Sequence, residues 1–186
     1  MSGRFITLAA LAAAFACVAG VAQAAVTVLG DGYAETCWRS AREGEATLAA
    51  EQVCTYALDV ELLSRRDRAG TYVNRGVLRM RRAEYPAALA DFDAAAGLEP
   101  ALGAAHVNRG AALIGLGRHA EGLAPLNRGL ELGVEEPAKA FYNRALAHEG
   151  VGDLKAAYLD YQKALQLDPA WSEPARELAR FQLGRL

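Results

Sequence analysis

A tripeptide recurs three times along this 186-residue chain. The sequence Asn-Arg-Gly at residues 74–76 returns at 108–110, and as Asn-Arg-Ala at 143–145, at spacings of 34 and 35 residues. The similarity extends well beyond the tripeptide, so the repeating unit is about 34 residues long. One such unit cannot bury its own apolar face, and stacking on its neighbours is what stabilises it. The sequence therefore predicts an array of stacked repeats.

Each copy places small and large residues at fixed positions. Positions are numbered from the first residue of each copy. Small residues occupy positions 8, 20 and 27, large ones occupy positions 4 and 24, and proline occupies position 32 in the first and third copies. The first copy (69–102) supplies Tyr72, Gly76, Ala88, Phe92, Ala95 and Pro100, the third (138–171) Phe141, Ala145, Ala157, Tyr161, Ala164 and Pro169, and the weaker second His106, Gly110, Gly122, Leu126, Gly129 and Val134. This pattern resembles the tetratricopeptide-repeat (TPR) family over roughly residues 31–186. The resemblance implies an all-α fold, an α-solenoid of helix-turn-helix repeats.

The register of the repeats divides the chain. Residues 31–68 are expected to form a degenerate TPR-like helix pair followed by a short extension (65–68). The three TPRs are then 69–102, 103–137 and 138–171, and 172–186 is a capping helix that covers the last apolar face. This register predicts nine helices from residue 31 onward. Pro125 falls inside the second helix of TPR 2, where a kink or a late start is expected.

The first 24 residues are typical of a signal peptide. Arg4 is followed by an apolar run from Ile6 to Val21, which closes on a small-x-small site at 22–24. Cleavage near Ala24 would leave a short linker, 25–30, and an exported protein, periplasmic or secreted, with no further membrane insertion. Two alternatives stay open: an uncleaved transmembrane anchor, and a lipoprotein acylated at Cys17, whose preceding residues match a lipobox poorly.

No constellation of catalytic residues is present in the sequence. The motifs of serine hydrolases, P-loop proteins and zinc proteases are missing, so we expect no enzyme, no cofactor and no metal. The histidines His106, His119 and His148 fall at packing or turn positions of different helices. A net charge of −2 without a basic run argues against nucleic acid as a partner.

The TPR resemblance implies that the first helix of each repeat lines a concave groove. The residues expected to face it are Val73, Asn74, Val77, Met80, Arg81, Val107, Asn108, Ala111, Ile114, Lys139, Tyr142, Asn143, Leu146 and Glu149. The asparagines at position 6 form a ladder, and a carboxamide can pair with the backbone of an extended peptide of any sequence. The alternative is that these asparagines belong to the folding pattern alone.

Arginine at position 7 needs a partner if it is half-buried. Aspartate at position 23 of the same repeat provides one, which predicts the pairs Arg75–Asp91 and Arg144–Asp160. TPR 2 has Pro125 at that position, so Arg109 would lack this partner and is the arginine that we expect to meet a ligand.

Two cysteines follow the signal peptide, and an even pair in an exported protein favours a disulfide. Cys37 and Cys54 fall at positions 7 and 24 of the degenerate repeat, where the TPR register brings two helices together. A Cys37–Cys54 bridge is therefore expected. Two buried free thiols are the alternative.

These observations predict a non-catalytic protein–protein interaction scaffold of the cell envelope, which binds a peptide segment of one or more envelope proteins in its concave groove. The alternative is an accessory or regulatory subunit of an envelope enzyme or assembly complex.

Overall fold

The computed structural model describes residues 25–28 and 32–183, and this part contains nine α-helices and no strand. The predicted signal peptide lies outside the described residues. The helices are α1 (Tyr33–Glu43), α2 (Leu48–Val60), α3 (Arg65–Arg81), α4 (Tyr85–Leu98), α5 (Gly103–Gly115), α6 (His119–Leu132), α7 (Pro137–Gly150), α8 (Leu154–Leu167) and α9 (Ser172–Leu183).

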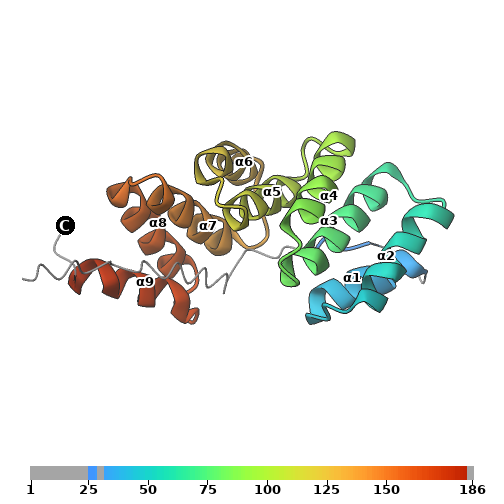
Figure 1. Cartoon of the computed structure of the whole chain (residues 1–186), viewed down its shortest axis with the longest axis horizontal. Helices are drawn as coiled ribbons and strands as arrows, with labels where there is room; N and C mark the ends of the chain where they lie inside the picture. Colours follow the sequence, from blue (N-terminus) through green and yellow to red (C-terminus); the bar gives the residue numbers. More distant parts are fainter. Residues whose placement is uncertain (1–24, 29–31, 184–186) are drawn as a thin grey trace, which may run out of the picture.

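The helices stack as pairs into an elongated arc (Figure 1). The first helices of the pairs, α1, α3, α5 and α7, contact one another in succession, while α2, α4, α6 and α8 each pack between their own partner and the next pair. The chain closes on α9, which packs against α8. The predicted all-α solenoid and its nine helices are thus confirmed in the described part of the chain.

Close packing within each pair explains the small and large positions of the repeat. In the first TPR, a Cβ atom at Gly76 of α3 would lie 2.5 Å from Cε1 of Phe92 on α4. Phe92 is fully buried, as are Ala88 and Ala95 on the same helix. The missing side chain on one helix is therefore the space that the aromatic ring of the other fills.

Contacts between successive repeats use a second glycine. Gly115, at the end of α5, lies under the ring of Tyr85 at the start of α4. A Cβ atom at Gly115 would lie 2.5 Å from Cδ1 of that ring. Gly150, at the end of α7, lies in the same way under His119 at the start of α6. We call these two contacts the inter-repeat joints.

Two helix boundaries differ from the sequence expectation. The predicted extension 65–68 is the first turn of α3, because the Ser64 hydroxyl caps that helix by accepting a hydrogen bond from the Asp67 N–H at 3.1 Å. Of the kink or late start expected at Pro125, the structure excludes the late start, because α6 begins at His119 and continues through the buried Pro125. Pro125 lies in the interior of α6, so the helix lacks the backbone hydrogen bond that an N–H would donate there.

The two ends of the array are held differently. At the N-terminal end, the predicted disulfide joins Cys37 of α1 to Cys54 of α2, with 4.8 Å between their Cα atoms, and both residues are fully buried. At the C-terminal end, Trp171 and Phe181 pack against the buried rings of Tyr142 and Tyr161.

None of the helices in the described residues is both long and apolar enough to cross a membrane.

Candidate functional site: the concave groove

The first helices of the repeats carry the residues predicted for the groove. These side chains are closely packed: those of Val73, Asn74, Val77, Met80, Val107, Asn108, Ala111, Tyr142 and Asn143 are buried, and those of Arg81, Ile114, Lys139, Leu146 and Glu149 are partly buried. The groove floor is thus an ordered surface and not an open hollow. Its buried polar members are the three asparagines of the ladder.

Asn74 of α3 is paired with the backbone of an extended segment. Its Oδ1 accepts a hydrogen bond from the Val26 N–H at 2.8 Å, and its Nδ2 donates one to the Val26 carbonyl oxygen at 2.9 Å. Residues 25–28, for which the sequence predicts a linker, therefore lie along α3. The Asn74 carboxamide thus binds a peptide backbone through both its oxygen and its nitrogen.

Asn143 of α7 occupies the same repeat position without such a partner. Its side chain is 1% exposed, and within the described residues neither its Oδ1 nor its Nδ2 has a hydrogen-bond partner. An unsatisfied buried carboxamide lowers stability, because its hydration is lost and nothing replaces it. Such a group at a position that binds backbone elsewhere in the same molecule is a candidate ligand contact.

A cavity of 370 Å³ lies between the 25–28 segment, α1, the end of α3 and the start of α7. It is lined by Ala25, Thr27, Trp38, Arg42, Arg81, Glu135, Glu136 and Lys139. The Arg42 guanidinium lies 5.0 Å from the centre of the Trp38 ring, and Lys139 forms an ion pair with Glu136 at 2.6 Å. Burial lowers the pKa of the Arg81 guanidinium from its usual range. The cavity therefore has a polar lining that carries charges of both signs.

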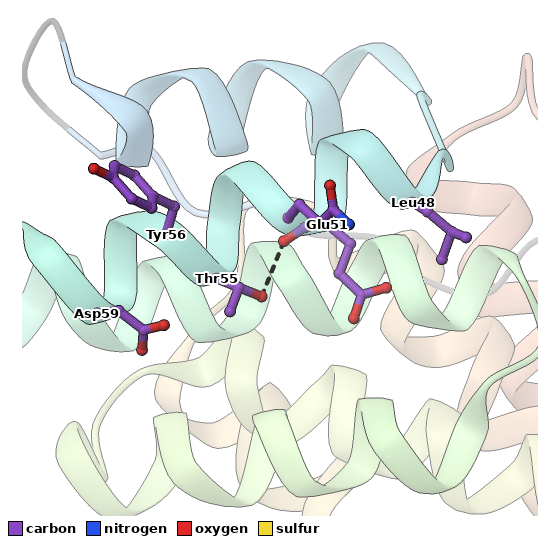
Figure 2. A pocket seen from close by; sticks show the side chains of 6 residues that line it. Leu48, Glu51, Thr55, Tyr56 and Asp59 are labelled. Carbon is purple, nitrogen blue, oxygen red and sulfur yellow. Dashed lines mark hydrogen bonds between the residues drawn. The ribbon is translucent and has the colours of Figure 1, made fainter.

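A second hollow, of 340 Å³, lies on the outer helix α2 (Figure 2). Leu48 and Tyr56 on its rim are 65% and 51% exposed. The Glu51 carboxylate in this region is engaged by Arg79 and Arg82. The hollow is part of the outer surface and holds none of the residues predicted for the groove.

The predicted arginine–aspartate pairs are both present. Arg75 Nη2 lies 2.7 Å from Asp91 Oδ1, and Arg144 Nε lies 2.7 Å from Asp160 Oδ2. Burial alone would lower the pKa of Arg75, but the hydrogen bond and charge of Asp91 outweigh it and the pKa is raised. These pairs hold the two helices of a repeat together.

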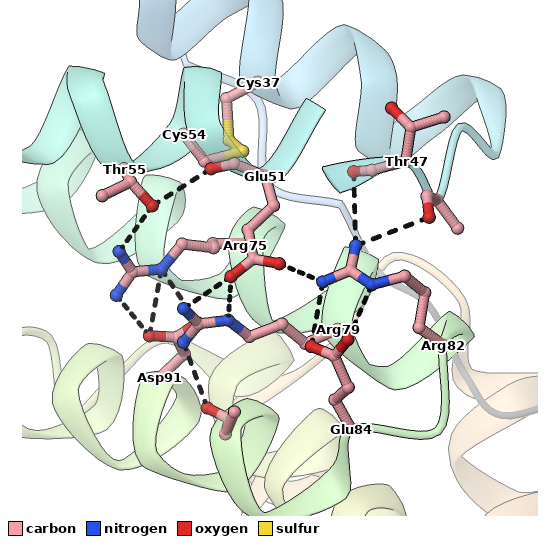
Figure 3. Close-up of polar contacts among 12 residues, drawn as sticks. Cys37, Thr47, Glu51, Cys54, Thr55, Arg75, Arg79, Arg82, Glu84 and Asp91 are labelled. Atoms are coloured by element: carbon pink, nitrogen blue, oxygen red, sulfur yellow. Dashed lines mark hydrogen bonds and ion pairs between the residues drawn. A yellow bond between two sulfur atoms is a disulfide. The ribbon is translucent and has the colours of Figure 1, made fainter. Parts of the chain in front are cut away.

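The first pair belongs to a larger network that sequence reasoning missed (Figure 3). Asp91 also contacts Arg79 at 2.9 Å, and Arg79 contacts Glu51 of α2 at 2.7 Å. Glu51 holds Arg82, which in turn pairs with Glu84. The network ties the degenerate repeat to TPR 1. The repeat pattern does not predict this network, because the residues that form it occupy different repeat positions.

Arg109 lacks an aspartate partner in its own repeat, as expected, but it has a partner that the sequence did not predict. Its Nε lies 2.6 Å from Asp93 Oδ1, and the Arg109 side chain is 42% exposed. Asp93 lies on α4 of the preceding repeat, and this neighbour replaces the partner that Pro125 removes. Arg109 therefore forms an ion pair between repeats, and its part in ligand binding stays a prediction.

The histidines lie on three helices, His106 on α5, His119 on α6 and His148 on α7. His106 Nε2 is 2.9 Å from the Pro100 carbonyl oxygen. The described residues contain no group of three histidine, cysteine, aspartate or glutamate side chains placed to hold a metal ion.

Comparison with known proteins agrees with this geometry. Residues 138–170 match the family model described as "Tetratricopeptide repeat". This chain is a TPR protein. It is 35% identical over 86 residues to the Hsp70-Hsp90 organizing protein of Triticum aestivum, a match that covers 46% of this chain and 15% of that relative.

Two solved structures share the fold of this TPR protein. MamA from Desulfovibrio magneticus RS-1 has a TM-score of 0.66 at 22% identity, covering 84% of this chain and 86% of that one. The second TPR domain of human RPAP3, solved in complex with the HSP70 peptide SGPTIEEVD, has a TM-score of 0.58 at 21% identity, covering 64% and 98%. TPR folds are in general non-catalytic interaction domains.

Proposed function

We propose that this TPR protein is a non-catalytic adaptor of the cell envelope, which binds an extended peptide segment of a partner protein in its concave groove. The observation that carries the proposal is the paired hydrogen bond between the Asn74 carboxamide and the backbone of Val26. It gives the asparagine ladder a physical role, because contacts to backbone are independent of the side chains of the bound segment.

The remaining groove contacts favour the same class of ligand. Asn143 offers a donor and an acceptor that no described residue uses, at the position equivalent to Asn74. Leu146, one turn further along α7, is partly buried and adds an apolar contact. The similarity in fold to a peptide-bound TPR domain supports a peptide as the ligand. A short segment buries little area, so we expect micromolar affinity.

The envelope location rests on the signal-peptide features of residues 1–24. The Cys37–Cys54 bridge supports it, because disulfides persist in oxidising compartments. Fractionation of the native cell, with N-terminal sequencing, tests this part of the proposal. The sequence should begin at Ala25 in the periplasm or the medium, and a chain that retains residue 1 in the cytoplasm would contradict it.

Photo-crosslinking in the cell tests the groove. A crosslinking amino acid at Leu146 should capture a defined partner, and replacing Asn108 and Asn143 together by alanine should reduce that capture at least tenfold. The matched control is Gln162→Ala, which removes an exposed amide from the outer helix α8. The proposal is wrong if the double variant, still helical by circular dichroism, captures the same partner equally well.

A further inference from the structure

Residues 25–28 run along α3 in the manner of a β-strand. Val26 and Val28 face the helix, and the Thr27 side chain between them is exposed. Val28 is 2% exposed and belongs to a small core with Ala34 and Ala57. This alternation is that of an extended segment bound on one side, as a peptide ligand would be.

The surface of α3 is shaped for this segment. A Cβ atom at Gly70 would lie 2.9 Å from Cγ1 of Val26 and 3.3 Å from Cγ2 of Val28, so glycine is what allows the approach. Gly70 is fully buried, and one turn further along α3 Asn74 binds the Val26 backbone. Ala25 and Thr27 form part of the wall of the 370 Å³ cavity.

We propose that residues 25–28 are an internal ligand, which occupies the α3 end of the peptide groove and competes with partner segments for Asn74. This inference rests on the proposed function of the groove. A partner segment would then bind first at the unoccupied Asn143 and reach Asn74 only when residues 25–28 leave. The segment also specifies a ligand class: an extended peptide with aliphatic side chains at alternate positions.

The competition has an expected size. Residues 29–31 alone separate the segment from Gly32 at the start of α1, and a tether this short gives an effective concentration in the millimolar range. The contacts are two hydrogen bonds and two valine side chains, which is a modest interface. A free peptide of the same sequence should therefore bind the intact chain about tenfold more weakly than a chain whose own segment is released.

The test compares single substitutions in the full chain, purified from the cell that makes it. Val26→Pro removes the backbone N–H that donates a hydrogen bond to Oδ1 of Asn74. Because Val26 lies outside the helices, folding should be retained. The probe is a fluorescein-labelled peptide with the sequence of residues 25–32, measured by fluorescence anisotropy. We expect about tenfold tighter binding by Val26→Pro than by wild type. Thr27→Ala, at an exposed side chain, is the control and should match wild type.

A second measurement reports occupancy without the probe. Amide hydrogen exchange at Val26 should be slowed in wild type and fast in Asn74→Ala. Fast exchange at Val26 in wild type, or equal probe affinity of wild type and Val26→Pro, overturns the internal ligand while leaving a working groove. Absence of probe binding by both chains overturns this inference, and it contradicts the proposed function only if partner capture from Leu146 is also independent of Asn108 and Asn143.

Discussion

At the scale of the residue, one repeat position serves in two environments. Asn74 has both halves of its carboxamide bonded to Val26, while Asn143 is equally buried and has neither bonded within the described residues. Removing a satisfied amide loses hydrogen bonds, whereas removing an unsatisfied one loses none and relieves a desolvation cost.

Alanine substitutions should distinguish the role of Asn74 from that of Asn143. Asn74→Ala is expected to lower the free energy of unfolding by about 1–2 kcal/mol, and Asn143→Ala to leave it unchanged or slightly raised. Urea denaturation followed by circular dichroism measures both. Equal losses would show that the ladder has a single structural role.

Tyr161 should make the stability of the folded protein depend on pH in the alkaline range. Burial raises the pKa of its phenol well above the usual range, and the charge of Glu149, to which the hydroxyl donates at 2.9 Å, adds to the shift. Because the folded pKa lies above the unfolded value of about 10, the stabilisation is full below pH 10 and is lost as pH rises beyond it. The midpoint temperature of thermal unfolding should fall steeply above pH 10 for wild type and less steeply for Tyr161→Phe. Parallel curves would contradict this.

Sequence reasoning succeeds for residues whose partners lie within one repeat. Arg75–Asp91 and Arg144–Asp160 follow from fixed positions on two helices of the same unit. It fails for Arg109, because Asp93 belongs to another repeat and occupies no position that the pattern marks. The pattern describes the unit, and the contacts between units depend on how the units are rotated against each other.

At the scale of the element, the weakest pair of helices is also the one with a covalent link. The degenerate repeat α1–α2 has Cys54 where its neighbours have a large side chain, and a terminal repeat has a neighbour on one side alone. The bridge closes a loop with a sequence separation of 17 residues.

Removal of the bridge should therefore destabilise this end selectively. Replacing both cysteines by alanine is expected to cost about 3 kcal/mol by the chain-entropy estimate. Hydrogen exchange should accelerate throughout α1 and α2 and stay unchanged in α7 and α8. Uniform acceleration over all helices would mean that the array unfolds as one unit.

Element boundaries show where local chemistry overrides the repeat. The family register places residues 65–68 outside TPR 1, but the Ser64 cap starts α3 there and lengthens the helix by a turn. The capping pattern, serine followed three residues later by an acid, is present in the sequence and could have given this boundary. Continuation of α6 through Pro125 has no comparable local signal.

At the scale of the whole molecule, the inter-repeat joints fix how one pair of helices sits on the next. Gly150→Ala would press a methyl group into the His119 ring and should cost about 1–3 kcal/mol. Gly97→Ala, on α4 with open space around it, is the matched control and should stabilise by about 0.5–1 kcal/mol. Urea denaturation measures both effects. If Gly150→Ala also stabilises the protein, the joint is not tightly packed.

The periodicity of the sequence was sufficient to predict the solenoid, because every unit repeats the same packing problem. It could not predict that residues 25–28 lie in the groove. That contact joins positions 48 residues apart, and it follows from Gly70 and Asn74, whose residue types fit an ordinary repeat equally well.

The bridge between α1 and α2 also has a mechanical meaning. Pulled by its two ends, a linear array unravels unit by unit and lengthens with each, but the residues between Cys37 and Cys54 cannot be drawn out. At about 3.6 Å per residue, the 17-residue separation withholds about 6 nm of contour length from the stretched chain. In single-molecule pulling, a reducing agent should return those 6 nm, so the oxidation state of the compartment sets how far this tether can extend.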